Sequence, residues 1–187
     1  LVAYARAERE RLEQAGGIAA PGRIGQAVGA DLDLLLKRLA FSAEASHLAA
    51  RTCSEHRRAG ALAALTAGRP DRRQVYHYFQ AAHPVGVEVA LLSLADHLAA
   101  WGADLVPERW QARRDVVHAL LTAFFAHYAE QVRPQPLLDG RQLLAGLGLA
   151  PGPQIGALLA QLQEEQAAGV ITTEAEAWDF VRTSAAL

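Results

Sequence analysis

The chain has few of the residues that make covalent or metal cross-links. Cys53 is the single cysteine among 187 residues, which excludes an internal disulfide and a zinc site built from several cysteines. A lone cysteine fits a reducing compartment, so we expect a cytoplasmic location. No apolar run reaches the roughly 18 residues that span a bilayer. The longest candidate, from Val85 to Trp101, is interrupted by Glu88, Asp96 and His97.

Methionine is absent and lysine nearly so. Because a complete translation product normally begins with methionine, we expect the chain to be a piece of a longer protein. Seventeen of the 18 basic residues are arginines and only Lys37 is a lysine, which codon bias explains as readily as function. The formal net charge of −2 does not by itself indicate a nucleic-acid partner.

Alanine and leucine dominate the remaining sequence, and signals for helix starts and ends recur along it. We therefore predict an all-α fold: a helical bundle within residues 1–133, followed by a small helical tail at 134–187. N-caps are predicted at Ser42, Asp71, Asp139 and Thr173. Proline-led helix starts are predicted at Pro84, Pro107 and Pro153. For the helices that start near Ser42, Asp71, Pro84, Pro107 and Pro153, the ends are expected near Arg57, Ala82, Trp101, Pro134 and Gly169.

The adjacent Asp96 and His97 are the first candidates for chemistry. Neighbouring residues on a helix point about 100° apart, so the two cannot share one core stripe. A metal site needs three or four converging ligands, and no other histidine stands next to an aspartate. We therefore expect no metal site here, and we expect Asp96 to be buried and hydrogen-bonded to a neighbouring helix.

Arginine clusters are the second candidate. Residues 51–73 hold six arginines against two acids, and Arg109, Arg113 and Arg114 form a second group. Arginine suits bidentate contacts to phosphate, although a merely solvated surface is the alternative. Tyr76, Tyr78 and Phe79 are open to two interpretations, base stacking or core packing. Residues 134–187 hold two arginines against six acids. This acidic segment is therefore not an obvious binder of a nucleic-acid backbone.

The turn "LGLAPGPQIG" at residues 147–156 precedes a predicted helix start. Free N–H groups at that start could bind a phosphate, and a tight structural turn is the alternative.

A longer stretch contains this turn and resembles a known family. It reads "PLLDGRQLLAGLGLAPGPQIGALLAQLQEEQAAGVITTEAEAWDFV", residues 136–181, and is similar to the C-terminal region of bacterial tRNA nucleotidyltransferases and related poly(A) polymerases. The positions that fit the family pattern are Gly140, Leu143, Leu147, Gly148, Pro151, Gly152, Pro153, Ile155, Gly156 and Gly169.

The preceding part resembles the HD-type helical region found in many of these enzymes. The matching segments are "RIGQAVGADLDLLLKRLAFSAEA", "EHRRAGALA" and "LLSLADHLAAWG". Where the pattern has a metal-binding histidine this chain has Gln26, so that only His56 and Asp96 remain of the metal constellation. Two such groups are too few to activate a water, and we interpret the HD-like region as degenerate.

The resemblance implies a non-catalytic helical fragment that holds and orients RNA while a head domain, outside this sequence, adds nucleotides to the RNA 3′ end. We expect no cofactor in the fragment and Mg²⁺ in the head of the parent protein. The residues predicted to contact RNA phosphates are Arg57, Arg58, Arg72, Arg73, Arg113 and Arg114. Two alternatives stay open: an HD-type metal-dependent phosphohydrolase, and a helical scaffold for dimerisation or for docking the head.

Overall fold

The computed structural model describes residues 32, 34–148 and 150–185. All the regular elements in these ranges are helices, which confirms the predicted all-α fold. The described residues form two compact units, each treated separately below. The first lies within Leu1–Arg69 and Ala81–Leu120, and the second within Pro70–Gln80 and Leu121–Leu187. The expected domain boundary near residue 133 stays a prediction.

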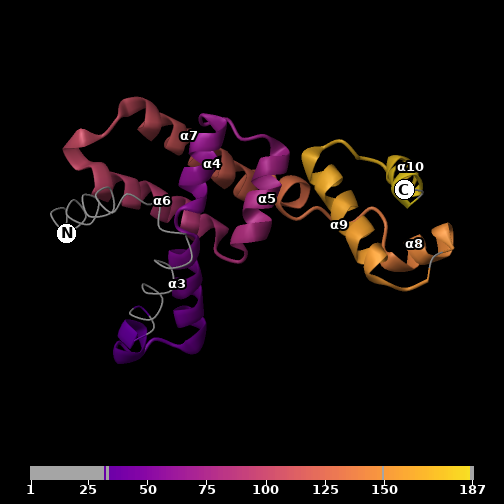
Figure 1. Ribbon diagram of the computed structural model, residues 1–187, viewed down its shortest axis with the longest axis horizontal. Coiled ribbons are helices and arrows are strands. Elements are labelled where there is room, and N and C mark those ends of the chain that lie inside the picture. The colour runs from indigo at the N-terminus through magenta and orange to yellow at the C-terminus, as the bar shows by residue number, and fades with distance from the viewer. Residues whose placement is uncertain (1–31, 33, 149, 186–187) are drawn as a thin grey trace, which may run out of the picture. The chain divides into compact units, whose positions relative to one another are not determined.

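The first unit is a helical bundle around α6 (Figure 1). Its elements are α3 (Ala43–Glu55), α4 (Arg58–Thr66), α6 (Gly86–Trp101), the short 3₁₀ turn η1 (Gly102–Asp104) and most of α7 (Pro107–Ala126). Both α3 and α4 pack against α6. The core includes small side chains, with Ala59 and Ala90 fully buried and Ala63 nearly so. Small side chains allow two helix backbones to approach closely.

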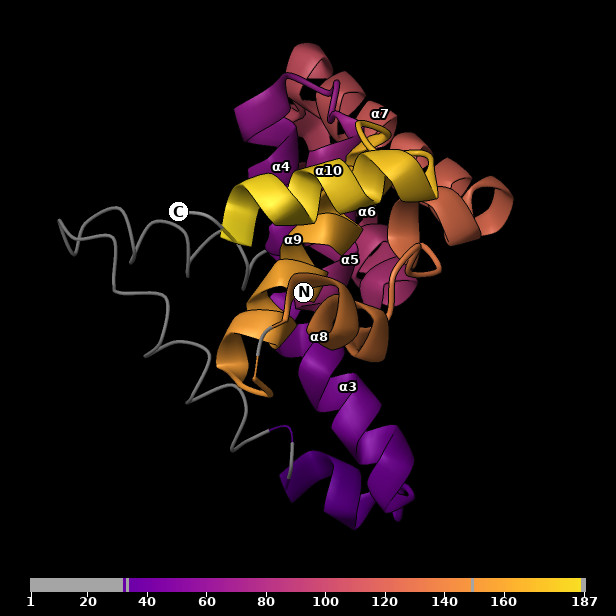
Figure 2. The ribbon, with the colours of Figure 1, turned by 90° about the vertical axis from the view of Figure 1, so that its right-hand side faces the viewer.

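The second unit is organised around α9 (Pro153–Ala168). Its other elements are most of α5 (Arg72–Ala82), the π-helix η2 (Tyr128–Val132), α8 (Gly140–Leu147) and α10 (Glu174–Ala185). Helix α9 contacts η2, α8 and α10, and Figure 2 shows α10 lying across it. The shared aliphatic core consists of Leu138, Leu143, Ile155, Leu158, Leu162, Ile171, Ala177 and Val181.

The predicted caps are confirmed. The Ser42 hydroxyl accepts a hydrogen bond from the Ala45 amide at 3.1 Å. Asp139 and Gln142 form a reciprocal capping box at the start of α8, and Asp71 with Gln74 makes the same pair of bonds before α5. The Thr173 hydroxyl accepts a hydrogen bond from the Glu176 backbone amide, and the Glu176 carboxylate accepts one from the Thr173 backbone amide. Each cap satisfies amides that a helix start leaves unpaired.

Three details differ from the sequence prediction. A separate helix, α4, follows the break at His56 and Arg57, and no capping pattern at its start allows it to be predicted. Helix α6 begins at Gly86, two residues after Pro84. Helix α7 ends at Ala126, and the chain continues as the π-helix η2, which ends before Pro134 as expected.

No single helix in the described ranges is long and apolar enough to cross a membrane, although one bent pair, α5 with α6 and η1, meets the criteria of length and composition.

The core around α9 predicts a large cost for truncating Leu162, which is 1% exposed. We expect Leu162→Ala to lower the free energy of unfolding by about 2–5 kcal/mol, because a cavity adds to the lost burial. Urea denaturation followed by circular dichroism measures this cost. The matched control is Leu65→Ala in α4, where the side chain is 77% exposed; equal effects of the two changes would contradict the packing described here.

Candidate nucleic-acid interface

The arginines near the start of α4 differ in their surroundings. Arg57 is exposed and pairs with no carboxylate among the described residues. Arg58 donates from Nε to Glu55 Oε2 at 2.8 Å, and Arg51 contacts the other oxygen of Glu55 at 2.9 Å. Glu55 therefore partly neutralises Arg51 and Arg58, whereas Arg57 has no carboxylate partner among the described residues.

The two arginines on α7 also differ. Arg113 is partly buried, and its Nη1 donates to the backbone carbonyl of Ser93 on α6 at 3.2 Å. Burial lowers the pKa of Arg113, with the Asp96 carboxylate opposing that shift, but an arginine stays charged. Arg114 is exposed and has no acidic partner in the part of the chain that the structure describes. Arg113 thus ties α7 to α6, whereas Arg114 faces solvent.

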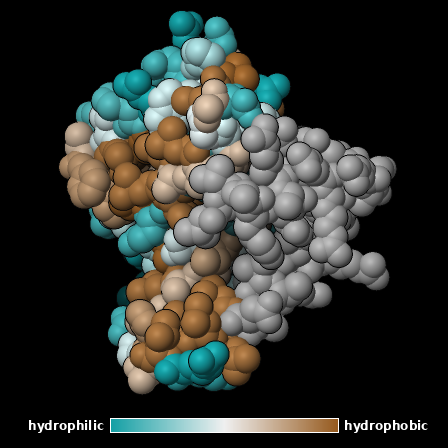
Figure 3. All heavy atoms as spheres, turned by 90° about the vertical axis from the view of Figure 1, so that its left-hand side faces the viewer, coloured by the Kyte–Doolittle hydropathy of each residue, from teal (hydrophilic) through white to brown (hydrophobic). Residues whose placement is uncertain are grey.

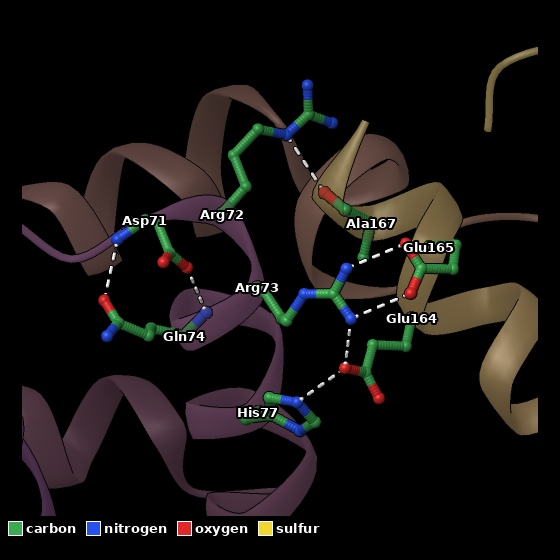
Figure 4. A network of polar contacts seen from close by, with 8 residues as sticks. All are labelled: Asp71, Arg72, Arg73, Gln74, His77, Glu164, Glu165 and Ala167. Atoms are coloured by element: carbon green, nitrogen blue, oxygen red, sulfur yellow. Dashed lines mark hydrogen bonds and ion pairs between the residues drawn. The ribbon is translucent and has the colours of Figure 1, made fainter. Parts of the chain in front are cut away.

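Arg72 and Arg73 belong to a polar network between α5 and α9 (Figure 4). Arg73 Nη1 donates to Glu164 at 2.6 Å, and Arg73 Nη2 donates to Glu165 at 2.7 Å. His77 Nε2 lies 3.0 Å from the same Glu164 carboxylate. The hydrogen bond from Arg73 is the main cause of the lowered pKa of Glu164. Arg72 donates from Nε to the Ala167 carbonyl at 3.0 Å.

The six arginines predicted from charge alone thus fall into two groups. Arg57 and Arg114 are exposed and unpaired among the described residues, whereas the other four have carboxylate or carbonyl partners within the fold. The partners Glu164 and Glu165 lie more than 90 positions from Arg73 in the sequence. Nothing in the local pattern around Arg73 indicates them. The phosphate-contacting role of all six stays a prediction.

The residual HD positions are Gln26, His56 and Asp96, and the described residues do not form a metal site around them. Gln26 lies outside those residues. His56 is partly buried, with Nδ1 2.6 Å from the Cys53 carbonyl oxygen, and Asp96 is exposed. No group of three or more potential metal ligands occurs in the described ranges. The phosphohydrolase alternative stays a prediction.

The expected burial of Asp96 was wrong, because its neighbour occupies the buried position. His97 is 6% exposed, and its ring contacts two tryptophans. It is parallel to Trp110 and tilted against Trp101, with ring centroids 6.0 Å apart in both pairs. Adjacent helix positions diverge by about 100°, so burying His97 turns Asp96 outward. The pair contributes a packed aromatic ring and a surface charge.

Burial is the main cause of the lowered pKa of His97. Arg113 and Arg109 lower this pKa further, and Asp96 opposes them. The Nε2 atom is buried and has no hydrogen-bond partner among the described residues. The neutral ring therefore suits this position better than the imidazolium.

The aromatic run on α5 is buried. Tyr76, Tyr78 and Phe79 are 6%, 3% and 5% exposed. They are core residues, as the packing interpretation predicted, and their rings are not available to stack on bases.

The glycine-rich turn between α8 and α9 borders an open hollow of about 490 Å³. Gly148 ends α8 in the left-handed conformation, with φ of 64°, a region that glycine enters without strain. Pro153 then begins α9. The hollow is lined mainly by apolar surface, with Asp139 and Arg141 as its charged lining residues. The described residues of this segment connect two helices, and the phosphate-binding alternative stays a prediction.

Comparison with known proteins gives two relatives for part of the chain. The A-adding tRNA nucleotidyltransferase of Deinococcus radiodurans is 38% identical over 92 residues, which cover 49% of this chain and 20% of the relative. The CC-adding tRNA nucleotidyltransferase of Thermus thermophilus is 29% identical over 111 residues, which cover 59% of this chain and 23% of the relative. Part of this chain is homologous to tRNA nucleotidyltransferases.

This homology confirms the resemblance that the sequence patterns indicated. It concerns about half of the chain, and the matches span about a fifth of the length of the curated relatives. No family model matches the sequence, and no solved structure matches it.

The environment of His97 predicts a pH dependence of stability. Because its pKa is lowered in the folded state from the ordinary value near 6.5, the unfolded chain binds a proton first as the pH falls. The stability from neutral His97 is therefore present above about pH 6.5 and is lost progressively below it. The urea concentration at the unfolding midpoint should fall as the pH is lowered from 7.5 to 5. We expect this fall to be smaller in His97→Phe, which keeps a ring against the tryptophans but cannot bind a proton.

The matched control is His118→Phe, which changes an exposed histidine on α7 and should leave the pH profile as it is. Parallel profiles for the native chain and His97→Phe would contradict the assignment.

Proposed function

We propose that this chain is a helical, non-catalytic part of a tRNA nucleotidyltransferase-like protein, and that it holds and orients RNA while a head domain outside this sequence adds nucleotides to the 3′ end. The observation that carries the proposal is the homology to an A-adding and a CC-adding tRNA nucleotidyltransferase. The Mg²⁺ expected for the reaction belongs to that head domain, so the residues described here have no metal-binding role in it.

An RNA-orienting surface needs cations that are free to meet phosphates. Phosphate contacts position an RNA without reading its sequence. Arg57 and Arg114 meet this requirement best, because both are exposed and neither has a carboxylate partner among the described residues. A phosphate would have to displace Glu164 and Glu165 to bind Arg73 in the same way, and the Ser93 carbonyl to bind Arg113. We therefore place the main phosphate contacts at Arg57 and Arg114.

The test is charge reversal in the full-length protein that contains this chain. We expect Arg57→Glu with Arg114→Glu to weaken binding of a tRNA transcript and to reduce the salt dependence of that binding, with the slope of log affinity against log salt falling by about one for each lost contact. Filter binding between 50 and 300 mM salt measures both effects, and a primer-extension assay follows nucleotide addition.

Arg182→Glu is the matched control, because Arg182 is an exposed arginine on α10 in the acidic tail. Its reversal changes the net charge by the same amount per residue and should affect tRNA binding much less. If the double variant binds tRNA with native affinity and native salt slope, the phosphate role of these two arginines is wrong. If the native full-length protein neither binds nor extends tRNA, the proposed function itself is wrong.

A docking role is a second candidate, and an exposed apolar surface favours it. Figure 3 shows hydrophobic side chains gathered on one face. The first unit exposes several large ones in its earliest described residues: Leu34, Leu35, Leu39, Phe41 and Leu48. Exposed apolar side chains that cluster together are typical of sites that contact another protein surface.

Leu34→Glu with Leu39→Glu tests this role. Both leucines are more than half exposed, so the double change should leave the fold intact. If the surface joins two copies in the full-length protein, analytical ultracentrifugation should show a lower mass for the variant. Leu65→Glu, which changes a more exposed leucine on α4, should keep the native mass. If the native protein is a monomer and the double variant has native stability and proteolytic resistance, the surface docks neither a copy nor the head.

A further inference from the structure

The junction of α7 and η2 exposes aromatic rings to an unusual degree. Phe125 is 74% exposed and Tyr128 is 41% exposed. A phenylalanine left in water forgoes the favourable free energy of burying its ring. The two residues lie where the α-helix ends and the chain widens into the π-helix Tyr128–Val132. π-Helical turns within helices are frequent at functional sites.

These rings are held in place by a third ring beneath them. Phe124 makes edge-to-face contacts with Phe125 and with Tyr128, with ring centroids 5.2 Å apart in both pairs and interplanar angles of 81° and 86°. Phe124 in turn contacts the buried Phe79 of α5, at 5.6 Å between centroids. We call Phe125 and Tyr128 the aromatic platform. The contacts with Phe124 restrict the arrangements of both rings, which lowers the entropy cost of binding.

An arginine follows the platform directly along the chain. The Arg133 amide donates to the Tyr128 carbonyl at 2.8 Å, which closes the π-turn and brings the two residues one turn apart. Arg133 is exposed and contacts no carboxylate among the described residues. The acid in this turn, Glu130, lies 3.7 Å from His127.

We propose that the aromatic platform stacks on unpaired bases of the bound RNA and that Arg133 contacts a neighbouring phosphate. This inference rests on the proposed function. Proteins recognise single-stranded loops and ends of RNA by stacking bases on aromatic side chains beside cations that follow the backbone. A protein contact is the other class of partner that suits this group, because protein interfaces are also enriched in aromatic residues and arginine. The homology to tRNA nucleotidyltransferases favours RNA as the partner.

The experiment measures tRNA binding by the full-length protein with Phe125→Ala and Tyr128→Ala. Each change should weaken the affinity for a tRNA transcript by about tenfold, the typical loss when one stacked base is released. The slope of log affinity against log salt should stay native, because no phosphate contact is removed. Arg133→Ala should instead reduce that slope by about one.

Three controls sharpen the test. Tyr128→Phe keeps the ring and should bind as the native protein does. Leu65→Ala removes an equally prominent exposed side chain, 77% exposed on α4, and should have no effect. A blunt RNA duplex, which offers no unpaired bases along its length, should be bound equally by the native protein and Phe125→Ala.

A direct readout keeps the proposal testable if an alanine variant folds poorly. In Phe125→Trp the new indole should be quenched when the tRNA transcript binds, and the duplex should quench it much less. Equal quenching by both RNAs, or none by either, overturns the stacking role.

The outcomes separate this inference from the proposed function. If Arg57→Glu with Arg114→Glu weakens tRNA binding while Phe125→Ala and Tyr128→Ala bind natively, the platform does not stack on RNA although the orienting role stands. If the platform variants instead lower the solution mass of the protein and leave tRNA binding unchanged, the platform is a protein contact and the inference is wrong. If the native protein does not bind tRNA, both proposals fail.

Discussion

The second unit depends on one buried stripe along α9. Ile155, Leu158 and Leu162 recur at the spacing that places them on one face of a helix, and all three are less than 9% exposed. Helices α8 and α10 and the π-turn η2 pack against α9. Because helices have no hydrogen bonds between them of the kind that join strands, such apolar contacts supply most of the free energy that holds the unit together.

Polar contacts then determine the orientation of α5 against α9. Arg73 bonds two adjacent glutamates on α9, and Arg72 reaches the Ala167 carbonyl near the end of the same helix. The Arg73 side chain is 39% exposed, so solvent screens its ion pairs and they contribute modestly to stability. Their directional geometry nevertheless orients α5, since a bidentate guanidinium fits a carboxylate in few arrangements. The arginines with such partners act first as parts of the fold.

The first unit uses its buried polar groups in a comparable way. Arg113 donates from α7 to a carbonyl of α6, and the buried His97 ring contacts two tryptophans. The cations and aromatic rings left outside these contacts, Arg57, Arg114 and the aromatic platform, carry the proposed interactions with RNA. The side chains proposed to contact RNA are therefore the charged and aromatic ones that the contacts described above do not engage.

Much of the architecture follows from the sequence alone. The caps at Ser42 and Asp139 and the helix that begins at Pro153 depend on residues within a few positions of one another, so local pattern is sufficient to predict them. The relation to tRNA nucleotidyltransferases is also visible in the order of residues along the tail. By contrast, the sequence did not show the separate helix α4, because its boundaries carry no cap that a local pattern reveals.

The sequence by itself determined the helical class, most helix boundaries and the family resemblance, because each of these depends on neighbouring residues. Only the tertiary structure decided that His97 rather than Asp96 is buried. The tertiary structure also decided that Arg73 is paired, while Arg57 has no carboxylate partner in the ranges that the structure describes. It also decided that Tyr76, Tyr78 and Phe79 are enclosed while Phe125 is exposed. These outcomes depend on which face of each helix meets another and on partners up to 92 positions away. Composition and spacing along one segment contain no information about such partners.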